Sequence, residues 1–255
     1  MSASRMKGII LAAGAGTRFN GAIHPKCLAL FNERTLISIQ LSALRSCGIS
    51  DITVVVGFAA DTVRLACGPN VQFVENTRFR ETNSLYSLWL ARPVLSEGFV
   101  VMNCDVLFDP AMLADLLTSR YDNALLVSYP GLDDAEWGDE EMKVQVRRGR
   151  VVDIDKGLSS RDSDGENVGI VKFSAGGAGR LIPMMDELMA AGHFRAWAPR
   201  AFKAFAQHNA LYAVGTRGLP WTEIDTPEDY RHAQERVYPA IRESIDRPQR
   251  LAVGA

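Results

Sequence analysis

Short apolar runs alternate with amphipathic stretches through the first hundred residues. Runs of four or five mostly apolar residues predict buried strands at 8–12, 52–56, 71–74 and 99–102. Stretches with helical periodicity lie between them and begin near Thr35, Asp61 and Ser84. This alternation is typical of a doubly wound, mostly parallel sheet, in which ligands bind beyond the carboxyl ends of the strands. The loop after residue 12, the turn at 103–105 and the loop around Asn83 are therefore expected along one edge.

The second half of the chain has a different pattern. Apolar and polar residues alternate at 142–147 and 151–155 on either side of Gly149, which predicts a β-hairpin that can wall a substrate pocket. Thr226 and Pro227, followed by two acids, predict the start of a helix. The remaining elements are strands expected at 28–31, 124–129, 168–173 and 211–214, and helices expected at 110–120, at 178–191 and from Pro199.

Length and composition fit one α/β domain. The 255 residues, 47% of them hydrophobic, are enough to bury a full core. The expected division is one domain at 1–246, with an insertion and hairpin at about 133–165, and a C-terminal tail at 247–255. The 28 basic and 30 acidic residues give a net charge of −2, which argues against bulk attraction to nucleic acid or to an anionic membrane.

The N-terminus lacks a signal-type apolar core, and no apolar run approaches the length of a membrane span, so a cytoplasmic location is expected. Four scattered cysteines without a Cys-x-x-Cys pair predict neither a zinc site nor a disulfide framework. The oligomeric state is open, with a homodimer favoured.

A glycine-rich loop follows the first strand, at 13–18. Glycines let several main-chain N–H groups approach an anion, and Arg18 and Lys26 add two positive charges, so the segment can bind phosphate. It is neither a P-loop, which needs Lys-Ser/Thr after the second glycine, nor a dinucleotide fingerprint, because Phe19 stands where the third glycine belongs. The alternative is an ordinary glycine-rich turn with surface cations.

The sequences LAAGAGTRF (11–19) and HPKCL (24–28) closely resemble the signature of nucleotidyltransferases that join a nucleoside triphosphate to a phosphorylated small molecule. The resemblance implies a Rossmann-like three-layer α/β sandwich with a mostly parallel mixed sheet, of the GT-A-like type, and a small β-hairpin insertion for substrate binding. It implies catalytic roles for Lys26 and Arg18, with Lys26 stabilising charge at the α-phosphate. The nucleotide-binding residues that it implies are Leu11, Ala12, Ala13, Gly14, Ala15, Gly16, Thr17, Arg18, Lys26, Asn83, Ser84 and Asp105.

Nucleotidyl transfer places negative charge on phosphates, so Mg²⁺ and carboxylate ligands are expected near the basic loop. Asp105 directly follows a predicted strand, while Glu223 and Asp225, at spacing two, face the same way if their segment is extended. Solvated or helix-capping acids are the alternative. The family resemblance assigns the metal to Asp105 and Asp225, with Glu223 as a third candidate. Cys104 is a departure, because many members have glycine there.

The sequence NSLYSL at 83–88 resembles the subgroup of cytidylyltransferases that act on phosphocholine or on aminoalkyl and hydroxyalkyl phosphonates. The resemblance implies that Lys143 and Lys156 bind the acceptor's phosphate or phosphonate, and that Glu166 and Tyr86 lie near its other end. Without this resemblance, the sequence favours a simpler interpretation: Tyr86 packs in the core and Asn83 only caps a helix. Lys143 and Lys156 are then solvated strand residues.

The resulting hypothesis is a Mg²⁺-dependent cytidylyltransferase. It transfers CMP from CTP to phosphocholine, 2-aminoethylphosphonate or a hydroxyalkylphosphonate and releases pyrophosphate, with neither nucleic acid nor a membrane as a partner. Two alternatives remain: a sugar-1-phosphate nucleotidyltransferase that uses UTP, GTP or dTTP, and a non-catalytic nucleotide-binding regulator.

Overall fold

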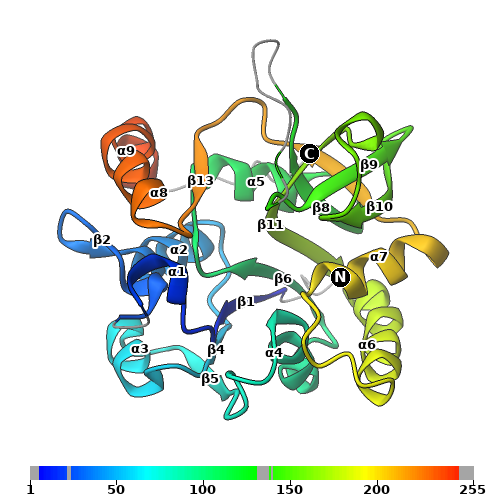
Figure 1. Cartoon of the computed structure of the whole chain (residues 1–255), viewed down its shortest axis with the longest axis horizontal. Helices are drawn as coiled ribbons and strands as arrows, with labels where there is room; N and C mark the ends of the chain where they lie inside the picture. The colour runs from blue at the N-terminus through cyan, green and yellow to red at the C-terminus, as the bar shows by residue number, and fades with distance from the viewer. Residues whose placement is uncertain (1–5, 22–23, 131–137, 139, 247–255) are drawn as a thin grey trace.

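A computed structural model of the chain describes residues 6–21, 24–130, 138 and 140–246. Within this part, helices cover both faces of a nine-stranded sheet (Figure 1). The strand order is β5-β4-β1-β6-β11-β8-β12-β10-β9. The strands are β1 (Lys7–Ala12), β4 (Ile52–Val56), β5 (Gln72–Glu75), β6 (Gly98–Asn103), β8 (Asn123–Ser128), β9 (Lys143–Arg147), β10 (Arg150–Asp155), β11 (Gly165–Ser174) and β12 (Tyr212–Gly215).

Strand directions confirm the predicted mostly parallel sheet. β1 pairs in parallel with β4 and β6, β4 with β5, and β8 with β12. β11 is antiparallel to β6, β8 and β9, and β10 is antiparallel to β12 and β9, so these two strands run against the other seven. Seven carboxyl ends therefore lie at one edge of the sheet.

The alternating side chains of β1 divide the core into two layers. Ile9 and Leu11 pack with residues of α4, α6 and α7 on one face, whereas Ile10 and Ala12 pack with residues of α2, α3 and α5 on the other. This is the predicted three-layer sandwich. The helices are α2 (Leu36–Ser46), α3 (Ala60–Cys67), α4 (Ser84–Leu90), α5 (Pro110–Thr118), α6 (Ala175–Ala190) and α7 (Pro199–His208), with the four-residue α1 (Thr17–Asn20) after β1.

The C-terminal helices form a smaller third cluster. α8 (Pro227–His232) begins where predicted, because the Thr226 hydroxyl accepts a hydrogen bond from the Asp229 N–H in a complete capping box. A π-helical turn then leads to α9 (Tyr238–Asp246), whose start the sequence pattern did not predict. Apolar residues of α9 pack with Phe31 and with residues of α2.

The predicted hairpin forms from β9 and β10, which pair antiparallel around a turn at Arg148 and Gly149. Because β9 also pairs with β11, the hairpin continues the main sheet. The predicted strand at 28–31 is wrong in its first half: Lys26–Leu28 form a 3₁₀ turn, closed by a hydrogen bond from the Ala29 N–H to the Lys26 carbonyl. β2 (Leu30–Phe31) follows and pairs with β3 (Arg34–Thr35).

A second two-stranded sheet was not predicted. β7 (Val106–Phe108) and β13 (Trp221–Glu223) pair antiparallel with Val106 opposite Glu223. This pairing ties the segment after β6 to the segment before α8, and it is essential to the site described below.

Part of the chain lies outside the described residues, including the predicted tail at 247–255 and most of 131–139, the start of the predicted insertion. Among the helices that are described, none has the length and apolar character needed to cross a lipid bilayer.

Candidate active site

A cleft of about 320 Å³ opens at the edge where the seven parallel strands end. Its lining comes from the loop after β1, the turn after β6, the start of α4 and the segment after β13. The sequence-predicted residues that line it are Leu11, Ala13, Gly14, Gly16, Thr17, Arg18, Lys26, Asn83, Ser84, Asp105, Lys156, Glu223 and Asp225. Ala12, Ala15, Tyr86, Lys143 and Glu166 are not part of the lining.

Gly16 allows Lys26 to reach the floor of the cleft. Its φ of 59° lies in the left-handed region that glycine favours. A Cβ at this position would lie 2.5 Å from Cγ of Lys26, so only glycine leaves space for the lysine side chain. Pro25 precedes the 3₁₀ turn that begins at Lys26 and fixes the backbone approach.

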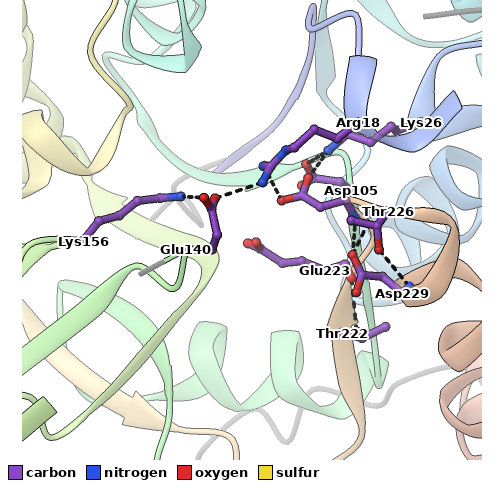
Figure 2. A network of polar contacts seen from close by, with 10 residues as sticks. Arg18, Lys26, Asp105, Glu140, Lys156, Thr222, Glu223, Thr226 and Asp229 are labelled. Atoms are coloured by element: carbon purple, nitrogen blue, oxygen red, sulfur yellow. Dashed lines mark hydrogen bonds and ion pairs between the residues drawn. The ribbon is translucent and has the colours of Figure 1, made fainter. Parts of the chain in front are cut away.

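The Lys26 ammonium bridges two aspartates from distant parts of the chain. Nζ lies 2.9 Å from Oδ2 of Asp105 and also contacts Oδ1 of Asp225 (Figure 2). Asp105 directly follows β6, and the pairing of β7 with β13 brings Asp225 beside it: the Ile224 N–H donates to the Asp105 carbonyl over 2.9 Å. The Asp229 carboxylate fixes the start of α8 by accepting from the Asp225 N–H.

The charges in this centre are strongly coupled. Burial lowers the pKa of Lys26, but Asp105 and Asp225 raise it by more, so this pKa lies well above its usual value. Burial raises the pKa of Asp225, but Lys26 and Arg18 hold it below its usual value. Burial and the two aspartates raise the pKa of Glu223 well above its normal range. The protonated form of Glu223 is therefore favoured beside Asp105 and Asp225.

A second set of ion pairs spans the mouth of the cleft. Arg18 donates to Asp225 over 2.7 Å and to Glu140 over 2.9 Å, and Lys156 contacts the same Glu140 oxygen over 3.2 Å (Figure 2). Glu140 was not predicted as a site residue, because it lies in an acidic loop with no local motif. Lys156 also lies 5.1 Å from the ring centroid of Trp197, another lining residue that was not predicted.

Among the described residues, no group of three or more His, Cys, Asp or Glu side chains has an arrangement that could hold a metal ion. The pair Asp105 and Asp225 is nevertheless suited to Mg²⁺, which keeps several waters and needs only one or two protein carboxylates. Oδ1 of Asp105 is buried and accepts no hydrogen bond from any described group, an unmet acceptor that a cation would satisfy.

The family of MobA-like NTP transferase domains matches residues 8–219. The chain belongs to this family. It is 27% identical over 240 residues to the choline-phosphate cytidylyltransferase of Streptococcus pneumoniae, a match that covers 90% of this chain and 97% of that protein. It is 30% identical over 205 residues to the 2-aminoethylphosphonate cytidylyltransferase of Lancefieldella rimae, covering 75% of this chain and 77% of that protein.

A solved structure of the CTP:phosphocholine cytidylyltransferase from Streptococcus pneumoniae has the same fold, with a TM-score of 0.74 and 25% identity over 91% of this chain and 98% of that chain. These similarities confirm the family that the glycine-rich loop indicated, and they confirm the predicted nucleotidyltransferase fold.

In this MobA-like chain, the start of α4 is held by a partly buried polar network. Asn83 caps the helix by accepting from the Ser84 N–H over 2.7 Å, and Ser84 Oγ accepts from the Ala198 N–H over 2.9 Å. The Asn76 amide donates to Thr82 Oγ1 and to Ser87 Oγ, so the loop before α4 is rigidly positioned. The four polar side chains Asn76, Thr82, Asn83 and Ser84 all line the cleft.

The predicted acceptor-binding residues are divided between the cleft and its surroundings. Lys156 lines the cleft, whereas Lys143 is buried and donates to the Lys156 carbonyl over 2.8 Å. Tyr86 packs against Trp89 and Phe194, with ring centroids 5.5 and 6.0 Å away.

Glu166 lies on β11, directly before the lining residue Asn167. Burial and the nearby Glu141 raise the pKa of Glu166 to about 7, against the lowering effect of Lys143. Asn103 and Asn167 also line the cleft; the turn at 103–105 was expected at this edge, but neither asparagine was predicted as a site residue. An isolated glycine within a predicted strand indicates that another group approaches the backbone closely, so Gly169 could have drawn attention to this part of the site. Its φ is 81°, and a Cβ there would lie 2.7 Å from Nδ2 of Asn103.

Proposed function

We propose that this MobA-like protein is a cytidylyltransferase that transfers CMP from CTP to a small phosphorylated or phosphonate acceptor and releases pyrophosphate. The observation that carries the proposal is the position of Lys26 between Asp105 and Asp225, directly beside the glycine-rich loop. The similarity to cytidylyltransferases that act on choline phosphate and on 2-aminoethylphosphonate supports CTP as donor and a small acceptor.

The reaction needs no covalent intermediate with the protein. A phosphate or phosphonate oxygen of the acceptor forms a bond to the α-phosphorus of CTP, while the bond from that phosphorus to the pyrophosphate oxygen breaks. Lys26 stabilises the charge that develops on the α-phosphate, and Arg18 with the N–H groups of the glycine-rich loop binds the triphosphate. Arg18 is half exposed at the mouth of the cleft, where the triphosphate would displace Glu140 as its partner.

Asp105 and Asp225 would hold Mg²⁺, with Glu223 nearby as the third candidate. When bound, the ion neutralises phosphate charge and aligns the triphosphate. The unmet Oδ1 of Asp105 supports this assignment. Removal of divalent metal with EDTA should abolish turnover, and added Mg²⁺ should restore it; turnover that persists after complete chelation would contradict the assignment.

At the acceptor side, we assign the phosphate or phosphonate to Lys156 and Lys143 and the opposite end of the acceptor to Glu166 and Tyr86. Lys156 lines the cleft and would contact the acceptor directly. The other three residues do not line the cleft and would act on the acceptor through the residues that do. In this proposal, the described residues up to 246 form a single nucleotidyltransferase domain, and the described part of the predicted insertion, 138 and 140–165, lines the acceptor site. A cytoplasmic homodimer stays a prediction.

The decisive experiment measures pyrophosphate release with Mg²⁺ for CTP, UTP, GTP, dTTP and ATP, each with phosphocholine, 2-aminoethylphosphonate, 2-hydroxyethylphosphonate and several sugar 1-phosphates. The proposal expects turnover with CTP and one or more of the small acceptors. Turnover only with a sugar 1-phosphate would overturn the acceptor class. Nucleotide binding without any turnover would support a non-catalytic regulator.

A further inference from the structure

A second hollow lies at the opposite edge of the sheet from the cleft. It has a volume of about 560 Å³ and lies where β8 and β12 begin, at their amino ends. None of its lining residues takes part in the nucleotidyl-transfer centre described above. The lining consists of Arg120, Tyr121, Asp122, Asn123, Arg148, Arg180, Ala210 and Tyr212.

The hollow carries an excess of positive charge. Three arginines from three separate elements surround it: Arg120 from the segment after α5, Arg148 from the β9–β10 turn and Arg180 from α6. Among the described residues that line it, Asp122 is the only one with a carboxylate. Within the described part of the chain, none of the three guanidinium groups forms an ion pair, and Arg120 donates to the Tyr121 hydroxyl and lies 5.2 Å from the centroid of its ring. By contrast, neighbouring Arg147 pairs with Asp164 at 3.6 Å.

Arg148 has a backbone conformation that arginine rarely adopts. Arg148 and Gly149 have φ values of 51° and 77°, a pair of left-handed residues for which Asn-Gly or Asp-Gly is the favoured sequence. The backbone at this position therefore favours a short polar residue over arginine.

Two stacked aromatic rings form one wall of the hollow. Tyr121 and Tyr212 stack with centroids 4.2 Å apart and ring planes at 10° to each other. The base of the wall is fixed by Asn123, a buried residue that donates to the Ala210 carbonyl and accepts from the Ser174 N–H. Because Ser174 caps α6, the positive end of that helix dipole lies next to the hollow.

We propose that this hollow is a second anion site, which binds the phosphate group of a small phosphorylated molecule. Guanidinium forks match phosphate oxygens in geometry and charge, and three arginines line this hollow with one carboxylate, Asp122, among the described lining residues. The stacked tyrosines provide an apolar surface for the organic part of such a ligand. With a net charge of −2 for the chain, the attraction is local and favours a small ligand over nucleic acid.

The proposal is tested by calorimetric titration of the full chain with inorganic pyrophosphate, phenyl phosphate and citrate. Three variants are compared with the wild type: the double variant Arg148→Gln/Arg180→Gln, the cleft variant Lys26→Ala and the control Arg147→Gln. The control removes one positive charge, where the double variant removes two, from an arginine that is adjacent to Arg148 and already has a carboxylate partner. Melting temperatures verify that each variant is folded.

The expected result is two pyrophosphate sites in the wild type and in Arg147→Gln. The double variant should weaken one of them by tenfold or more, as expected for the loss of two charge-assisted hydrogen bonds. Phenyl phosphate should show the same dependence on the two arginines. Lys26→Ala should affect only the other site. If the proposed function fails but this inference holds, a single site remains that depends on the arginines and not on Lys26.

Pyrophosphate and phenyl phosphate binding that is the same in the double variant as in the wild type overturns the proposal. So does a loss of equal size in Arg147→Gln, because it would reveal only a diffuse effect of net charge. Citrate binding as tight as that of pyrophosphate, with the same arginine dependence, would overturn the assignment to phosphate.

Discussion

Replacement of Lys26 by methionine removes the charge between Asp105 and Asp225 while it keeps most of the side-chain volume. Nζ contacts both carboxylates, and only 14% of the lysine side chain is exposed, so water cannot take over its role. The loss of one such preorganised charge costs roughly 10²–10³ in kcat, or about 3–4 kcal/mol of transition-state stabilisation. We expect the KM for CTP to change much less, because the glycine-rich loop and Arg18 still bind the triphosphate.

The same substitution leaves Asp105 without its cation, whereas Asp225 keeps its ion pair with Arg18. Loss of one partner of a fully buried pair costs about 3–5 kcal/mol of unfolding free energy, but water can partly solvate these carboxylates, so a cost of about 1–3 kcal/mol is expected. Asp105 and Asp225 have 22% and 25% of their side-chain surfaces exposed.

Lys7→Met is a closely matched control for this experiment. Lys7 is 17% exposed and pairs with Asp51 at 3.2 Å, but it lies at the opposite end of β1 from the cleft. Steady-state pyrophosphate release and urea unfolding should be measured for both variants. Lys7→Met should retain wild-type kcat. A folded Lys26→Met protein with kcat within about threefold of wild type would refute the catalytic role.

Three further predictions concern residues around the centre. Gly16→Ala should lower unfolding free energy by about 1–2 kcal/mol, because φ is positive and the new Cβ would collide with Lys26, whereas Gly14→Ala, with open space at Cβ, should change the melting temperature little. Asp229→Ala removes the carboxylate that accepts from the N–H groups of Asp225 and Thr226. We expect kcat to fall, while thermal melting shows only the loss of a helix cap, about 1 kcal/mol of unfolding free energy. The folded-state pKa of Glu166, about 7, lies above its usual 4.5, so ionisation destabilises the fold increasingly as pH rises from 4.5 to 7. The difference in unfolding free energy between Glu166→Gln and wild type should therefore favour the variant more at pH 8 than at pH 4.5, by on the order of 2–3 kcal/mol. Equal differences at both pH values would contradict this prediction.

Local signals predicted most of the fold. The continuous apolar run at 52–56 is a central strand, Thr35 caps α2, and the alternation around Gly149 forms a hairpin. Each of these depends on neighbouring residues in the sequence, so pattern and capping rules apply.

What the sequence did not reveal depends on contacts between distant segments. β7 and β13 have three residues each, too few to show a period, and they are more than one hundred residues apart. For the same reason, Glu140 could not be recognised as the partner of Arg18. The family resemblance drew attention to Lys26 and Asp105, which line the cleft, but only the folded chain shows that Lys143 donates to a backbone carbonyl.

The ion pair of Lys26 with Asp225 has a consequence for the timing of synthesis. The two residues are 199 positions apart, so the ribosome must add nearly two hundred residues before the lysine meets its second carboxylate. At about 5–20 residues per second, that interval is roughly 10–40 s. During it, the glycine-rich loop has emerged and the first strands can pair, but the centre is incomplete. A nascent or truncated chain that ends before β13 would therefore contain the glycine-rich loop and Lys26 but not Asp225.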